Sequence, residues 1–596
     1  MTKMWQEMGN GITLFQIGRC DKHNILVSGE AHSMTTVKYL IKIIAKSSFS
    51  RIIINYNFQL TMIINMLYIT IKYNFNVFDG FKKTVFAVVF FLFCLTPHSY
   101  ANDLRIENVV IDSTDSEQKV ADIVFDLSWE NSWRNMTNWD AAWIFVKYST
   151  DAGLTWSHAT LKTSGTNPSG FDSGDGTKTD IIVSSDKKGC FVQRSFVGSG
   201  KVAISELRLL WDWGTDGLKA QDSVRIKVFG VEMVYIPEKS FYIGDGNNTT
   251  ESQYAFHAGA TNAAVQITNA LVGNIRVDAG ASDDAQITGS GIGIDGDGGV
   301  DTNNDGNIDN ANFPVGYEAF YAMKYEITEG QWVDFFNTLN QNQRDVRDIT
   351  SSSGKNSDAV VDRNTVGWGG LGDASTQRTD RACGYLSWMD LCAYADWAAL
   401  RPLTELEFEK AARGSNTPNL NEYAWGSDSV VAARAISGSE DGTETISTSG
   451  ANCCYDNVAF SGGDGGNGPV RAGIFATEIS TREDAGAGYY GVMELSGNLS
   501  ERCVTLGNSA GRKFAGSNGD GALNLQSGFE GNATNSDWPG YVESQGVVGA
   551  AGSGLKGGNW QDTDVAGLQL SYRGKASQND DSRQSGFGGR CARTAQ

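Results

Sequence analysis

Histidine, proline and positive charge are scarce in this sequence. Only five of the 596 residues are histidine and the last is His257, which excludes a histidine-ligated metal, a Ser-His-Asp triad and a histidine general base within residues 258–596. The 8 prolines and 70 glycines follow no Gly-X-Y period, which excludes collagen and favours a turn-rich fold. With 48 basic and 69 acidic residues, the net charge of −21 argues against nucleic acid as a partner.

The first 101 residues consist of two dissimilar segments. Residues 1–80 show neither an amphipathic period nor turn signals, and we interpret them as a mis-assigned start or an atypical leader. Residues 81–101 carry a lysine pair, a 12-residue apolar run and small residues up to Ala101, the pattern of a cleaved secretory signal peptide. Such a run is about 18 Å long as a helix, too short for a bilayer core of about 30 Å. We therefore expect a secreted, periplasmic or cell-surface protein with no membrane span after cleavage.

The chain that follows the signal peptide is more acidic and keeps an odd number of cysteines. Residues 1–101 hold 10 basic and 4 acidic residues, which leaves 38 basic and 65 acidic residues and a net charge of −27. This charge suits Ca²⁺ binding, and it equally suits simple solubility. Export permits disulfides, but an odd count leaves at least one thiol unpaired. The seven cysteines are Cys190, Cys383, Cys392, Cys453, Cys454, Cys503 and Cys591.

Residues 102–230 have the pattern of a β-sandwich. Segments 120–129, 142–148 and 223–229 are rich in β-branched and aromatic residues and are separated by Gly, Ser, Asp and Asn turns. Four tryptophans crowd this region, and such clusters are more often core packing than a carbohydrate platform. They are Trp129, Trp133, Trp139 and Trp143.

A Gly- and Asp-rich insertion spans residues 258–312 and ends in a candidate calcium loop. Oxygen-bearing side chains at alternate positions, a glycine and a further acid match the first nine positions of such a loop. A bidentate glutamate is missing at the twelfth position, so a plain acidic turn is the alternative. The candidate ligands are Asp301, Asn303, Asp305 and Asp309.

Three helices are predicted beyond residue 314. Capping boxes at Thr328 and Thr404 each precede apolar residues at helical spacing; the first helix presents a buried face up to Leu339, and the other stops at Gly414. Ser387 opens a further amphipathic stretch. After these helices, regular structure gives way to long loops rich in Gly, Asn and Asp.

Nine short segments stand out along the rest of the chain: 233–237, 241–244, 320–332, 386–388, 401–414, 423–426, 490–498, 555–560 and 586–593. In this order they resemble the formylglycine-generating enzyme, or sulfatase-modifying factor, family over about residues 231–596. The resemblance implies a variant of the C-type lectin fold, a domain with short helices and long loops. Together with the β-sandwich predicted at 102–230, it gives an α+β protein.

The resemblance also indicates where this chain departs from the family's oxidase chemistry. The family binds copper through two cysteines five positions apart, since two thiolates suit Cu(I). Counting from the motif Gly557-Gly-Asn-Trp560, those positions hold Asp562 and Gly567. Neither residue replaces a thiolate, so we expect neither copper nor formylglycine generation. The adjacent Cys453 and Cys454 have poor chelate geometry and are expected to be buried or disulfide-bonded.

Structural Ca²⁺ is implied by the same resemblance. Its ligand positions are retained better than those of copper, since side-chain and carbonyl oxygens on loops are what Ca²⁺ needs. Turn-forming Asn and Asp residues are the alternative interpretation. One implied site contains Asn498, Leu499 and Glu501, and the other contains Asn452, Cys453 and Asp464.

Three functions fit the sequence. The first is an exported, non-catalytic relative that binds a protein, peptide or glycan through its loops. The second is an enzyme, either the family's oxidase or a new activity built on carboxylates such as Asp562 and Asp564. The third is a diversified lectin-like recognition protein whose variable face comprises residues 559–585. The missing cysteine pair favours the first.

Overall fold

The computed structural model describes most of the chain beyond residue 102, and the chain divides into two units, Met1–Pro97 and His98–Gln596. In the first unit, β1 (Gln16–Cys20), β2 (Asn24–Ser28) and β3 (Arg51–Ile54) form a three-stranded sheet. Apart from these strands, the predicted leader and signal peptide lie outside the described residues, as does the candidate calcium loop. The second unit is described over residues 103–163, 171–172, 177–245, 255–258, 263–268, 275–276, 310–477, 479–576 and 578–595.

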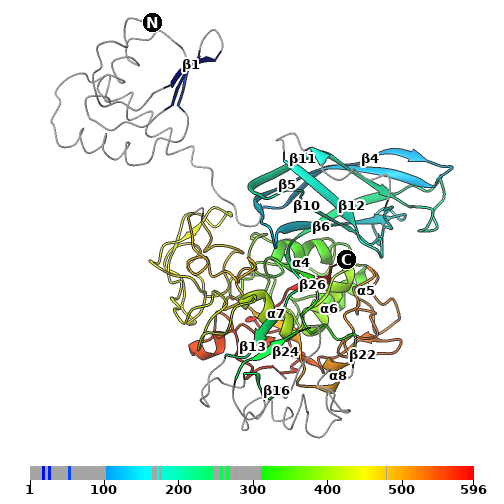
Figure 1. Cartoon of the computed structure of the whole chain (residues 1–596). Helices are drawn as coiled ribbons and strands as arrows, with labels where there is room; N and C mark the ends of the chain where they lie inside the picture. The colour runs from blue at the N-terminus through cyan, green and yellow to red at the C-terminus, as the bar shows by residue number, and fades with distance from the viewer. Residues whose placement is uncertain are drawn as a thin grey trace, which may run out of the picture. The chain divides into compact units, whose positions relative to one another are not determined.

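A three-stranded sheet opens the second unit. It consists of β4 (Arg105–Asp115), β5 (Val120–Arg134) and β11 (Gly198–Trp211), in the order β11-β5-β4 (Figure 1). β5 contains the strand predicted at 120–129. Its apolar side chains alternate with partly exposed ones along part of its length because only one face of this sheet is covered.

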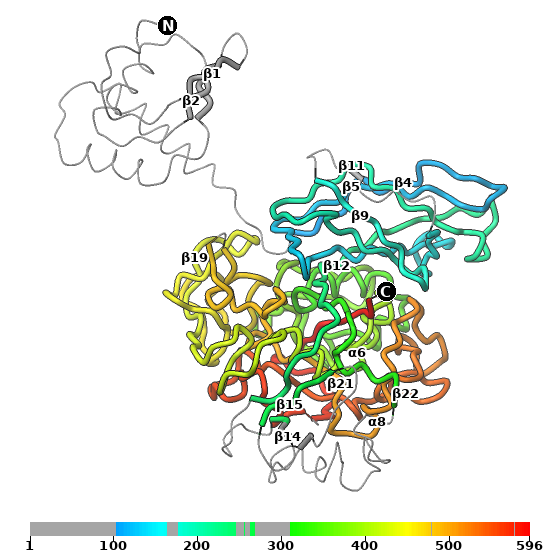
Figure 2. Tube along the Cα trace, in the orientation of Figure 1, coloured from blue at the N-terminus to red at the C-terminus, as the bar shows by residue number. Residues whose placement is uncertain are grey.

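A nine-stranded antiparallel sheet packs against the first one. Its order is β18-β26-β17-β12-β6-β10-β9-β8, and β7 pairs with β6 beside this path. Figure 2 labels two of its strands, β9 and β12. The sheet brings together strands from both ends of the second unit. They are β6 (Asp140–Ser149), β7 (Ser157–His158), β8 (Phe171–Asp172), β9 (Lys178–Val183), β10 (Cys190–Arg194), β12 (Arg225–Ile236), β17 (Phe320–Met323), β18 (Arg401–Pro402) and β26 (Cys591–Thr594).

Strand β6 is buried along its whole length because both faces of the large sheet are covered. Ile144 packs into the core shared with β5 and β11, whereas Trp143 and Phe145 pack on the opposite face. There the ring of Phe145 meets that of Trp397, with centroids 5.0 Å apart. A strand covered on both faces has a nearly continuous apolar sequence, which explains the run at 142–148.

Strand β12 crosses the predicted domain boundary between residues 230 and 231. It pairs with β6 from Arg225 to Val234, and its end, Met233–Ile236, also pairs with β17. The predicted strand at 223–229 is thus the first half of a longer one. One continuous sheet runs through both parts of the chain, and the division at this position stays a prediction.

Two of the predicted helices begin at the capping boxes identified in the sequence. Helix α4 (Glu329–Phe336) has Thr328 as its N-cap, and helix α7 (Glu405–Arg413) has Thr404. In both, the side chain of the third helical residue, Gln331 or Glu407, accepts a hydrogen bond from the backbone N–H of the N-cap, as the box requires. Helix α7 ends at Gly414, whose φ of 68° suits glycine.

The third predicted helix is also confirmed, and a fourth was missed. Helix α6 (Trp388–Trp397) starts at the N-cap Ser387. Helix α5 (Gln341–Arg347) has a capping box at Asn340, but its only apolar residue is Val346, so no hydrophobic period signals it.

Apart from the two sheets and the four helices described above, the elements are short, as the turn-rich composition predicts. Together with the two large sheets they make an α+β fold. No helix among the described residues is long and apolar enough to cross a membrane. The remaining elements are β13 (Phe241–Ile243), β14 (His257–Ala258), β15 (Val265–Ile267), β16 (Ile275–Arg276), β19 (Ile436–Ser437), β20 (Thr445–Ile446), β21 (Ser500–Val504), α8 (Ser509–Arg512), β22 (Tyr541–Val542), β23 (Gly546–Val547), β24 (Ser553–Lys556), the 3₁₀ helix η2 (Val565–Leu568) and β25 (Phe587–Gly588).

Candidate functional site

The paired glycines after β24 bring three separate loops together. Gly557 and Gly558 have φ values of 84° and 68°, a region that side chains disfavour. A Cβ on Gly557 would lie 2.6 Å from the Glu501 carboxylate, and one on Gly558 would lie 3.0 Å from that of Asp562. Both positions therefore need glycine.

Asp562 and Gly567, five residues apart, lie next to each other. A Cβ built on Gly567 would be 3.8 Å from the carboxylate of Asp562. That carboxylate accepts a hydrogen bond from the Asn559 backbone N–H (2.8 Å) and pairs with Lys575 (3.2 Å). The turn of η2, capped by Asp564, returns the chain to this place. Two side chains at these positions could thus contact one ligand, but glycine offers none.

Three buried glutamates share one arginine beside this loop. Arg590 donates to Glu501 (2.6 Å) and to the carbonyl oxygen of Glu494 (3.2 Å). Glu326 accepts the Leu499 backbone N–H (2.8 Å). One carboxylate oxygen each of Glu494 and Glu501 makes no hydrogen bond within the described part of the chain.

Burial sets the protonation of these carboxyl groups. It raises the pKa of both Glu494 and Glu501 to about 7, although the Arg590 guanidinium partly opposes the shift. Burial and the neighbouring Glu501 carboxylate raise the pKa of Glu326 further. Arg590 acts on all three acids and Arg471 on Glu494 alone, so positive charge does not offset the burial of three carboxylates. The cluster therefore holds protons, or accepts a further cation, near neutral pH.

The loop from Asn498 to Glu501 is held by internal hydrogen bonds. The Asn498 side chain accepts from the Val470 N–H (2.8 Å) and donates to Glu326. Its backbone carbonyl accepts from the Trp560 N–H (2.9 Å). In the same predicted ligand set, one side-chain oxygen of Glu501 makes no hydrogen bond within the described residues.

The other predicted calcium set is divided between different partners. Asn452 accepts the Val431 N–H (2.9 Å), and the Cys453 thiol donates to the Ser496 carbonyl (3.1 Å). Asp464 belongs to a separate network of ion pairs. Hydrogen bonds join residues 452–454 to 496–498, but none joins Asp464 to Asn452 or Cys453.

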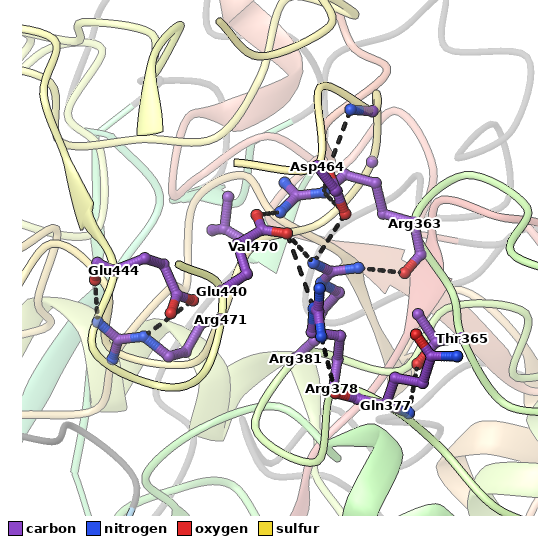
Figure 3. A network of polar contacts seen from close by, with 12 residues as sticks. Arg363, Thr365, Gln377, Arg378, Arg381, Glu440, Glu444, Asp464, Val470 and Arg471 are labelled. Atoms are coloured by element: carbon purple, nitrogen blue, oxygen red, sulfur yellow. Dashed lines mark hydrogen bonds and ion pairs between the residues drawn. The ribbon is translucent and has the colours of Figure 1, made fainter. Parts of the chain in front are cut away.

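Asp464 lies in a network of arginines that the sequence did not reveal (Figure 3). Arg381 bridges Asp464 (3.0 Å) and Glu440 (2.8 Å), and Arg363 pairs with the same two carboxylates. Arg378 lies 3.7 Å from Glu440. Burial alone would raise the pKa of Asp464, but the two close guanidinium groups and a backbone N–H lower it to about 2.

Comparison with known proteins bears out the resemblance. The sulfatase-modifying factor enzyme 1-like domain matches residues 292–595, just over half of the chain. The chain belongs to this family. Over 135 residues it is 31% identical to the formylglycine-generating enzyme of Thermomonospora curvata, a match that covers 23% of this chain and 37% of that relative. The shared part is thus little more than a third of the relative's length.

The chain's own donors do not fit the copper that the family's oxidases bind. Asp562 and Gly567 supply no sulfur. The seven cysteines of the described residues are all buried and unpaired, and burial raises the pKa of every one of these thiols. Thiolates are the copper ligands and nucleophiles of proteins, so these side chains are inert in the folded state.

The donors fit Ca²⁺ unevenly. The described residues contain no group of three or more His, Cys, Asp or Glu side chains placed to hold a metal. Asp464 is neutralised by two arginines, so its set fits poorly. Glu501 fits better, because its free oxygen and the adjacent carboxyl groups would gain from a cation.

The sequence analysis identified the loops around Asp562 and Glu501, but it did not identify three charged residues that lie beside them. Glu326, Glu494 and Arg590 were overlooked because they come from three distant segments. A buried Arg in the C-terminal Gly-Gly-Arg-Cys segment was the available signal, since a buried charge requires a partner.

Proposed function

We propose that this protein is an exported, non-catalytic member of the sulfatase-modifying factor family that binds a protein, peptide or glycan. Its first strands would form a β-sandwich module, and its lectin-like loops would carry the ligand. The observation that carries the proposal is the pair of adjacent positions Asp562 and Gly567, where the family's oxidases need two thiolates.

The chemistry around this pair supports a binding role. Asp562 is already engaged by Lys575 and by the backbone N–H of Asn559, so both of its carboxylate oxygens have partners within the protein. No histidine follows His257. Within the described residues, the carboxyl groups with strongly raised pKa values beside this pair, Glu494 and Glu501, are buried.

An oxidase assay tests the absence of catalysis. The mature protein is incubated with Cu(I), oxygen and a sulfatase-derived peptide that contains cysteine, and aldehyde is captured with a hydrazide. We expect no aldehyde, whereas the formylglycine-generating enzyme of Thermomonospora curvata serves as the positive control. Aldehyde formation above a copper-only blank would overturn the proposal and favour the enzymatic alternative.

We further propose a structural Ca²⁺ at the loop that contains Asn498, Leu499 and Glu501. The buried, unpartnered oxygen of Glu501 supports it, because such a group costs stability unless a cation or proton satisfies it. Elemental analysis should find about one calcium per chain, and a chelator should lower the melting temperature. Glu501→Gln should abolish the response to the chelator. A metal-free protein with an unchanged melting temperature would contradict this site.

The proposed export is tested at the N-terminus of the purified protein. N-terminal sequencing after expression in a secreting host should begin at Asn102, directly after the predicted cleavage site. A mature chain that starts before residue 80 would contradict both the signal peptide and the interpretation of residues 1–80.

A further inference from the structure

One edge of the large sheet is left unpaired in the middle of a long strand. β12 pairs with β6 from Arg225 to Val234, but it pairs with β17 only from Met233 to Ile236. After β17 the chain leaves the sheet at Lys324 and turns into α4. Among the described residues, the half of β12 that precedes Glu232 therefore has a neighbouring strand on one side only.

The hydrogen-bond pattern shows which residues face the open edge. The Lys324 N–H donates to the Glu232 carbonyl oxygen (2.9 Å), so the backbone groups of Glu232 point toward β17. The Tyr235 N–H donates to the carbonyl oxygen of Trp139, just before β6 (2.8 Å). The backbone groups of the odd-numbered residues of β12 therefore point toward β6. Because the backbone groups of an antiparallel strand alternate in direction, the even-numbered residues face the edge.

Three residues therefore present free backbone groups there. Ile226, Val228 and Gly230 each direct an N–H and a C=O away from β6, and no other strand of the described chain pairs with them. All three are partly exposed. The edge thus offers alternating donors and acceptors at the spacing of a β-strand.

A groove of about 540 Å³ follows this edge. On one side lies the start of β4, with the apolar residues Leu104, Ile106 and Val109. A Cβ on Gly230 would lie 2.8 Å from Leu104, so the wall is close to the strand. On the other side lie Lys227 and Asp334, the latter from α4.

We propose that this groove binds an extended peptide of a partner protein, which joins the sheet beside β12 as an added strand in line with β17. Its backbone would pair with Ile226, Val228 and Gly230. Its side chains would alternate, apolar toward β4 and polar toward Lys227 and Asp334. None of these residues belongs to the Asp562 site, so the inference goes beyond the proposed function and stands independently of it.

Other occupants fit the groove less well. A glycan or lipid headgroup does not supply N–H and C=O groups in alternation. The rim carries both signs of charge, Arg105 and Lys227 against Glu107 and Asp334, and so favours no strongly charged polymer.

A displayed peptide library tests the proposal. Hexapeptides with Val, Ile, Thr or Phe at alternate positions and polar residues between them are selected on the immobilised mature protein. Selected peptides should protect the amides of Ile226, Val228 and Gly230 from hydrogen exchange. N-methylation of the alternate peptide amides that face β12 should abolish binding, and methylation of the other set should not.

A pair of variants locates the binding edge. Val228→Pro removes the outward N–H while leaving the ladder to β6, since proline is tolerated where the N–H faces solvent. It should weaken peptide binding at least tenfold. Val228→Thr, which keeps the N–H and the branched side chain, should stay within threefold. The methylated peptides test the same hydrogen bonds on wild-type protein if the proline variant does not fold.

Two results would overturn the proposal. One is a library that yields no peptide whose binding depends on the Val228 N–H or on the methylated amides. The other is protection of the three amides that rises with protein concentration in the absence of peptide, because that would make a second copy of the chain the occupant.

Discussion

Replacing Trp143 by alanine should weaken the whole of residues 103–595 rather than the N-terminal strands alone. Trp143 is fully buried on the face of the large sheet that meets the helices. Its indole N–H donates to the Ala398 carbonyl (2.9 Å), and Arg593 stacks over its ring at 4.1 Å. These partners lie about 250 and 450 residues away in the chain. The substitution therefore removes a contact between the two halves of the second unit.

The magnitude follows from the volume removed. Truncating a buried tryptophan to alanine costs about 3–5 kcal/mol, from lost transfer free energy and the cavity left behind. Because one sheet runs through both halves, the loss should shift a single unfolding transition. Urea unfolding should be monitored by tryptophan fluorescence and by circular dichroism. The curves from the two probes should coincide for the wild-type protein and should also coincide for the variant, at a lower urea concentration.

Phe196→Ala provides the matched control. This aromatic side chain is 69% exposed, so its removal should change the free energy of unfolding by no more than about 0.5 kcal/mol. The reasoning is refuted if Trp143→Ala costs under about 1 kcal/mol. It is equally refuted if two separate transitions appear and only the one from the first strands moves.

Three further predictions concern the site and its surroundings. The double variant Asp562→Cys/Gly567→Cys should bind one Cu(I) in competition with a chromogenic chelator, because the two positions are adjacent, while either single variant should not; equal binding by all three would contradict the geometry. Since burial raises the pKa of Glu494 to about 7 from 4.5, the folded state binds the proton more tightly than the unfolded state. Stability should therefore fall as the pH rises from about 4.5 to 7, and Glu494→Gln should flatten this slope in melting curves. The seven buried thiols should react with a thiol reagent only after unfolding, and reductant should leave the melting temperature unchanged.

Local patterns predicted three helices and parts of the strands β5, β6 and β12, because the causes of these elements are local. The capping boxes at Thr328, Ser387 and Thr404 each start a helix, since the hydrogen bonds of a cap join residues three apart. Helix α5 was not predicted because it is polar on nearly every side. Its Asn340 cap was visible, but without an apolar period a cap alone does not predict a helix.

The candidate site was predictable only in part. The positions of Asp562 and Gly567 follow from a motif, and their contact follows from a short turn. The arginines around Asp464 were not predictable, because Arg363 and Arg381 lie about 100 and 80 residues from it in the chain, respectively. In the sequence, a loop aspartate that pairs with an arginine cannot be distinguished from one that binds a metal ion.

By itself, the sequence determined which chemistry is available: no histidine after residue 257, no thiol at positions 562 and 567, and caps that start three helices. Only the tertiary structure decided which charges pair and that one sheet runs through β12 into both halves of the second unit. Among the described residues, the same structure leaves Ile226, Val228 and Gly230 with a neighbouring strand on one side only, that of β6. Strand order and ion pairing join residues hundreds of positions apart, and nothing in a local pattern of residues specifies which of them will meet.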